Sequence, residues 1–221
     1  EWNAYGTAKV GNKWETTILG HFEDQSRKND RNEDGFLDNP LVNDYILHNQ
    51  WNYRGKNLHM ELGINGSLGK MNSGNTDIDP SYPVNIESTQ ANAFAKIGYL
   101  FPGHDFRSLA LQLSTTYNDQ NTTIGTSTYS GIQQSLYANL IFQEELGESE
   151  ENYFKIGASL QVDSVDESMA LNYISQPSLN NGYDFNWLDI TPGVYGEFTH
   201  NSEKWGAIIG LRGDYSTLYD Y

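Results

Sequence analysis

The sequence has 221 residues, a formal net charge of −16 and no cysteine. The negative charge argues against nucleic acid as a partner, because phosphate binding needs a stripe of Lys and Arg, and the lack of cysteine excludes disulfides and thiolate metal sites. Mean hydropathy is −0.63. No apolar run reaches the roughly 18 residues of a membrane-spanning helix, which excludes helical membrane proteins.

An alternation of apolar and polar side chains recurs along almost the whole chain. A period of two places successive side chains on opposite sides of a strand, so each such stretch predicts a strand with one apolar and one polar face. The predicted strands are residues 2–10, 14–23, 45–53, 58–68, 93–101, 107–118, 135–143, 154–163, 190–199 and 207–215. The pattern therefore predicts an all-β protein of about ten antiparallel strands.

The sixth of these stretches, residues 107–118, has the sequence RSLALQLSTTYN. Leu109, Leu111 and Leu113 form its apolar series, and Gln112 and Ser114 belong to its polar series. Most strands in soluble domains have about five or six residues, whereas about nine to eleven tilted residues cross a bilayer. The length of this strand favours a transmembrane β-barrel.

The predicted connections alternate between short turns and long loops. Short turns are expected at residues 11–13, 54–56, 102–106, 144–151 and 201–204, and long loops at 26–43, 70–89, 119–128 and 164–186. Aromatic residues gather near the short-turn ends: Trp14, Trp51, Tyr53, Tyr99, Phe101, Phe142, Phe154 and Trp205. Unequal rims and an aromatic girdle are typical of outer-membrane barrels. A soluble meander or sandwich would explain the alternation, but not the strand length, the unequal loops and the girdle together.

The first long loop has the spacing of a calcium-binding loop. In DRNEDGFLD, at residues 30–38, oxygen-bearing side chains stand at positions 1, 3, 5 and 9, and glycine at position 6 permits a sharp turn. The candidate Ca²⁺ ligands are Asp30, Asn32, Asp34, Phe36 through its backbone carbonyl, and Asp38. Position 12 is Leu41 instead of the glutamate of an EF-hand, and no flanking helix is predicted. The alternative is a solvent-exposed turn, which Asn, Asp and Gly form readily.

Other polar residues offer weaker candidates. His21, His48 and His59 all belong to the polar series of their strands and would share a face. The polar and aromatic residues at 164–187 would form either a mouth that captures a ligand or an ordinary surface loop. We expect no enzyme activity, because the sequence has none of the common motifs for nucleophilic, zinc or phosphate chemistry.

Seven strings of residues occur in order along nearly the whole chain. They are DRNEDGFLDNP at 30–40, QWNY at 50–53, IGYLFP at 97–102, TYNDQN at 116–121, SLYANL at 135–140, PGVYGEF at 192–198 and GLRGDY at 210–215. In this succession the chain resembles the barrel of TonB-dependent outer-membrane receptors of the Bacteroidetes type. The resemblance implies an antiparallel up-and-down barrel of about 22 strands occluded by a plug domain.

The resemblance also implies a function and a location. Such receptors import a scarce small-molecule ligand, such as siderophore-iron, cobalamin or a glycan, across the outer membrane of a Gram-negative bacterium. This sequence shows no plug, no TonB box and only about ten strands, so we expect residues 1–221 to be a contiguous barrel fragment. It would contact membrane lipid, and would reach TonB and the plug domain through parts outside this chain. The rival interpretations are a passive porin-like barrel closed by ten strands and a soluble calcium-binding β protein that acts in adhesion.

Overall fold

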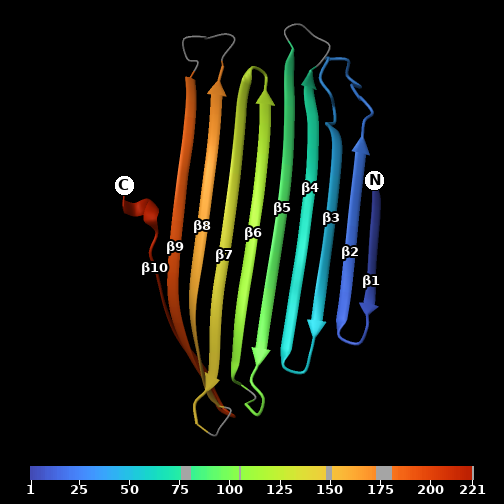
Figure 1. Cartoon of the computed structure of the whole chain (residues 1–221). Helices are drawn as coiled ribbons and strands as arrows, with labels where there is room; N and C mark the ends of the chain where they lie inside the picture. Colours follow the sequence, from blue (N-terminus) through green and yellow to red (C-terminus); the bar gives the residue numbers. More distant parts are fainter. Residues whose placement is uncertain (76–80, 105, 148–150, 173–180, 221) are drawn as a thin grey trace.

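The computed structural model describes residues 1–75, 81–104, 106–147, 151–172 and 181–220, and it shows one sheet of ten antiparallel strands (Figure 1). The strands are β1 (Trp2–Val10), β2 (Trp14–Gln25), β3 (Leu41–Arg54), β4 (Leu58–Asn75), β5 (Tyr82–Leu100), β6 (Ser108–Ile124), β7 (Ser127–Glu145), β8 (Asn152–Leu171), β9 (Asn181–Asn201) and β10 (Gly206–Asp214). A short 3₁₀ helix, η2 (Thr217–Asp220), follows β10. The predicted all-β, up-and-down arrangement of about ten strands is confirmed.

The sheet has two open edges. Its strand order is the chain order, and among the described strands β1 pairs with β2 alone and β10 pairs with β9 alone. Figure 1 shows β1 and β10 at opposite sides of the sheet. The sheet is therefore open, and its two edge strands do not pair to close a barrel.

The predicted division into short turns and long loops is wrong for three of the four long loops. The described residues of 70–89, 119–128 and 164–186 lie largely within strands, which reach 17 residues in β6 and 21 in β9. Residues 76–80 and 173–180 of these predicted loops lie outside the described residues. At the most compact of these connections Ile124 pairs with Ser127, so a two-residue turn that starts with Gly125, at a φ of 59°, joins β6 to β7. The backbone ladder continues through Thr, Asn, Ser and Gln on both faces, and these residues hide the alternation that marks a strand. Only residues 26–40 remain as a long connection with described structure.

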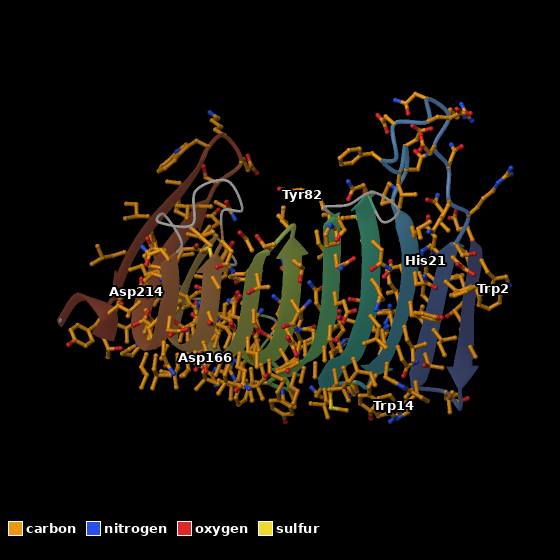
Figure 2. The ribbon with its side chains drawn as sticks, turned by 90° about the horizontal axis from the view of Figure 1, so that it is seen from above. Trp2, Trp14, His21, Tyr82, Asp166 and Asp214 are labelled. Atoms are coloured by element: carbon orange, nitrogen blue, oxygen red, sulfur yellow. The ribbon has the colours of Figure 1, made fainter. Side chains whose placement is uncertain are left out.

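The register confirms the predicted faces. Leu111 of β6 lies opposite Ile97 of β5 and Leu140 of β7, while Gln112 lies opposite Lys96 and Asn139. We call these two sides the apolar face and the polar face of the sheet. Figure 2 shows Trp14 and Asp166 on one side of the ribbon and His21 and Tyr82 on the other, which agrees with their positions in the register.

The sheet is a single layer without a hydrophobic core. Among the described residues, Val165 on the polar face is the only hydrophobic side chain classed as buried, at 7% exposure. A soluble sheet normally buries one face against a second layer. Here the apolar face has no such cover.

A proline within β9 fits because β10 has ended beside it. The last pair of β9 and β10 is Gly193 with Asp214, and the backbone N–H of Tyr215 donates to the carbonyl of Pro192 at 3.0 Å. The nitrogen of Pro192, which carries no hydrogen, faces the same side as its carbonyl. β10 has already ended there, so no ladder bond to β10 is lost. Proline is tolerated at such a local edge.

Glycines on the polar face make room for aromatic rings. The Tyr195 ring lies across Gly157 of β8, and its hydroxyl donates to Oδ1 of Asn139 on β7 at 3.1 Å. A Cβ added at residue 157 would stand 2.2 Å from that ring. The glycine therefore links three neighbouring strands through one tyrosine.

We expect Gly157→Ala to lower the free energy of unfolding by about 1–3 kcal/mol, the usual cost of overpacking. The added methyl group must push the Tyr195 ring aside and break its hydrogen bond to the buried Asn139 side chain. Gly98→Ala on the polar face of β5 is the control, because nothing lies within 4 Å of its added Cβ. Urea titration followed by tryptophan fluorescence measures both values. Equal values for the two variants would contradict this packing.

Candidate functional site

The apolar face carries a band of hydrophobic side chains, which we call the apolar band. It covers nine residues on each of three strands, Tyr45–Tyr53 on β3, Leu109–Tyr117 on β6 and Phe154–Val162 on β8. At about 3.4 Å per residue, nine residues extend for about 27 Å along the strand. In transmembrane barrels about nine to eleven tilted residues of each strand cross the bilayer, so the band has the length of a spanning strand.

The side chains of the apolar band are exposed. The exposed fraction is 60% for Ile64, 55% for Leu68 and 46% for Leu140. Because about half of each side chain is already covered, moving the rest out of water would gain roughly half of the 1.5–3 kcal/mol of full burial. A continuous surface of this kind marks a contact with lipid or with another protein.

Aromatic residues stand at both limits of the apolar band. Near the short turns the Trp14 ring lies 4.9 Å from that of Tyr53, and the Phe142 and Phe154 rings lie 6.2 Å apart. The register places six of the eight predicted girdle residues on the apolar face, namely Trp14, Trp51, Tyr53, Tyr99, Phe142 and Phe154, whereas Phe101 and Trp205 lie in turns outside the strands. A second pair, Phe22 with Tyr45 at 4.9 Å, lies at the opposite limit, which the sequence did not indicate.

Beyond this second limit the same face becomes charged. Asp119 of β6 lies opposite Ile132 of β7, which lies opposite Asp166 of β8, and Lys70 of β4 pairs with Glu87 of β5. The strands continue past the apolar band in this direction. The sheet thus has an apolar section and a polar extension.

Behind the apolar band, the polar face is linked by hydrogen bonds between strands. Lys96 Nζ donates to Glu61 at 3.4 Å, and Asn139 donates to Oε1 of Gln112 at 3.2 Å. Arg212 of β10 reaches past β9 to donate to Oγ of Ser159 at 3.0 Å. These bonds make a polar wall directly opposite the hydrophobic one.

The three candidate histidines share the polar face but do not converge. Nδ1–H of His21 donates to Oδ1 of Asn3 at 2.7 Å, and His48 is the diagonal neighbour of His21 on β3. His48 pairs with Asn65, six residues along β4 from His59, so about 20 Å separates His59 from the others. Only two of the three histidines are close enough to act together.

The predicted calcium loop folds around its own carboxylates. The backbone N–H groups of Gly35, Phe36 and Arg31 donate to Asp30, Asp34 and Asp38 at 2.9, 2.8 and 2.9 Å. Gly35 has a φ of 82°, in the region that favours glycine, as the predicted sharp turn requires.

The remaining predicted ligands lie in the same loop. The amide of Asn32 donates to Oδ2 of Asp34 at 2.9 Å, and Phe36 forms an isolated bridge with Asn75 of β4. The donor set consists of oxygen atoms only and fits a hard cation such as Ca²⁺. Calcium binding stays a prediction, because the same hydrogen bonds would form in an Asn/Asp/Gly turn that binds no metal.

Within the described part of the chain, a histidine and two glutamates outside this loop lie close enough together to hold a metal ion. Ligand atoms of His104, Glu144 and Glu145 lie within 4.8 Å of one another, whereas the three loop aspartates do not form such a group. Glu144 is already paired with Arg107. No sequence motif predicts this cluster, because the histidine and the two glutamates belong to different segments of the chain.

The described residues of the proposed ligand mouth at 164–187 are mostly strand, and they border a hollow in the polar face, which we call the Val165 hollow. Residues 173–180 of the predicted mouth lie outside the described part of the chain. The Val165 hollow has a volume of about 210 Å³. Its lining residues are Asn118, Tyr129, Gly131, Ile132, Gln133, Val165, Glu167 and Trp187. The sequence pattern placed these residues in three separate segments, and only the strand pairing brings them together.

One wall of the Val165 hollow is fixed by a hydrogen bond. The Tyr129 hydroxyl donates to Oε1 of Glu167 at 2.7 Å, and its ring covers Gly131, where an added Cβ would stand 2.4 Å from the hydroxyl. This hydrogen bond raises the pKa of Tyr129 above its usual value, with burial and the Glu167 charge adding to the effect. The phenol therefore stays protonated at neutral pH.

Comparison with known proteins adds no assignment. No protein-family model matches the sequence, and no curated protein matches it. Within the described residues, no helix is long and apolar enough to cross a membrane.

We expect Ca²⁺ to raise the melting temperature of the protein if the loop at residues 30–38 binds it. At a Ca²⁺ concentration one hundred times Kd, the gain of about 2.7 kcal/mol corresponds to a rise of about 5–10 °C. Thermal melts with Ca²⁺ and with chelator measure this difference. Asp30→Asn keeps an acceptor oxygen but removes a charge and should reduce the rise, whereas Asp24→Asn on β2 is the control. Identical melts with Ca²⁺ and chelator would refute the site.

Proposed function

We propose that this chain is a contiguous part of the β-barrel of a TonB-dependent receptor in the outer membrane of a Gram-negative bacterium. It acts as a binder and transporter rather than as an enzyme. The observation that carries the proposal is the exposed apolar band on a one-layer sheet, backed by a hydrogen-bonded polar wall. The resemblance of the seven sequence strings supplies the family.

The bilayer is the partner that this surface fits best. The nine residues of the apolar band on each strand match the roughly nine to eleven tilted residues that cross a bilayer, and aromatic rings stand at both limits of the band. Inside hydrocarbon every backbone polar group needs a partner, and the ladder supplies one for each interior strand. A soluble adhesion protein would leave the same hydrophobic surface in water.

The open edges favour part of a larger barrel over a passive ten-stranded porin. β1 and β10 carry no pairing with each other, and unpaired strand edges seek further strands. In a receptor of about 22 strands the remaining strands would cover both edges. The plug and the TonB contact would come from segments outside these 221 residues.

The polar face would then line the lumen, where the ligand passes. Candidate cargo includes siderophore-iron, cobalamin or a glycan. We further propose that Ca²⁺ held by Asp30, Asn32, Asp34, Phe36 and Asp38 braces the loop between β2 and β3. That loop lies at the end of the sheet opposite the β1–β2 and β3–β4 turns (Figure 1).

We expect Leu113→Arg to reduce insertion into lipid vesicles, because a charge on the lipid side near the midplane costs about 2–4 kcal/mol. Leu113 lies on the apolar face of β6. Ser114→Arg, on the polar face one residue further, is the control and should insert like the unmodified protein. Flotation of refolded protein with vesicles in a density gradient measures the inserted fraction. A compact monomer that stays in the detergent-free aqueous fraction would contradict the proposal.

We also expect the mature protein in outer membranes to be much larger than this chain. The chain has a mass of 25.0 kDa for ten strands. A barrel of about 22 strands at the same mass per strand reaches about 55 kDa before any plug is added. Immunoblotting of isolated outer membranes with an antibody against this chain tests the size. A single band near 25.0 kDa would favour the ten-stranded porin.

A further inference from the structure

The Val165 hollow has an apolar floor and aromatic walls. Val165 is buried at 7% exposure, and Trp187 of β9 is its register partner on the polar face. Tyr129 is held in place from the other side by its bond to Glu167. A ligand in the hollow would therefore contact carbon atoms and aromatic rings as well as the polar side chains of the lining.

Polar groups around this floor have no partner within the described part of the chain. The amides of Asn118 and Gln133 and the indole N–H of Trp187 make no hydrogen bond with any described residue. Asn118 pairs with Gln133 across β6 and β7, and Gln133 pairs with Val165, so the three residues lie side by side. The hollow thus offers donors and acceptors together with an apolar surface.

This combination selects a class of ligand. A pyranose ring presents C–H groups on its faces and hydroxyls, which both donate and accept, around its rim. Aromatic side chains pack against the C–H faces, and the amides of Asn118 and Gln133 can donate to and accept from the hydroxyls. An anionic ligand would meet the Glu167 carboxylate and a chain of net charge −16. A quaternary ammonium would leave both amides without partners.

Size and position agree with a sugar subsite. Drug-sized ligands occupy about 300–1,000 Å³, so the hollow of about 210 Å³ takes one ring of a longer molecule. It lies beyond the apolar band, since Asn118 follows the last band residue of β6, Tyr117, and Val165 lies past Val162 of β8. On the other face of the same strands stand Asp119 and Asp166. A soluble ligand reaches the hollow without entering the apolar section.

We propose that the Val165 hollow binds one pyranose ring of a neutral oligosaccharide, with Trp187 and Val165 beneath the ring and Asn118 and Gln133 on its hydroxyls. The proposal rests on the proposed receptor function, since it takes the polar face as the ligand side. It narrows the cargo of that receptor to a glycan.

The test is binding of the purified protein to an array of neutral hexaoses of glucose, mannose, galactose and xylose. The protein is kept in an alkyl poly(ethylene glycol) ether detergent, because sugar-headed detergents would compete. At least one hexaose should bind, and Trp187→Ala should weaken that binding about tenfold or more. Trp187→Tyr keeps an aromatic ring and should restore most of the affinity. Phe185→Ala, which removes an exposed ring next to the hollow, is the control and should change affinity by less than about twofold.

Three results would overturn the proposal: no binding to any neutral hexaose, binding that Trp187→Ala leaves unchanged, or binding of tetramethylammonium in place of the sugars. Unchanged circular dichroism of the variants shows that the sheet is intact. The binding assay needs neither vesicles nor TonB, so its failure is distinguishable from failure of the receptor proposal. Loss of sugar binding with normal flotation rejects the sugar subsite alone, and the reverse result rejects the membrane barrel alone.

Discussion

The backbone hydrogen-bond ladder between neighbouring strands holds this structure together. With one buried hydrophobic side chain among the described residues, the sheet has no core to stabilise it. In water a backbone hydrogen bond contributes only about 0.5–1.5 kcal/mol net, but an unpaired group in an apolar medium costs several kcal/mol. The ladder would therefore contribute most to stability in an apolar medium, which is also the medium that the apolar band favours. The same medium that accepts the exposed leucines also penalises any break in pairing.

The register of strand pairing decides which side chains lie on each face of the sheet. Because side chains alternate with a period of two, a slip of one residue would move Leu109, Leu111 and Leu113 to the polar side. It would also separate pairs such as Lys96 with Glu61 and break the packing of Tyr195 over Gly157. The apolar band and the polar wall thus specify the same register from opposite sides of the sheet.

The strands extend beyond the apolar band, and this extension contains the Val165 hollow. On β8 the band ends at Val162, yet pairing with β9 continues from Ser164 to Leu171. Free of the need to face hydrocarbon, this section places Asp166 on one side and the Val165 hollow on the other. Under the proposed function, ligand binding and membrane insertion would use different lengths of the same strands, so the ligand site could vary without disturbing the apolar band.

The sequence alone determined the ten strands, their order and the residues of each face, because alternation over nine residues is a local property of the chain. It also located the loop at residues 30–38, whose Asp30, Asp34 and Asp38 bond to nearby backbone groups. It missed the strand extensions, because polar residues on both faces erase the period of two while leaving the ladder intact. Only the tertiary structure decided that His59 lies apart from His21 and His48, and that Asn118, Gln133, Val165 and Trp187 meet. Those relations depend on the register in which consecutive strands pair, which no single stretch of sequence contains.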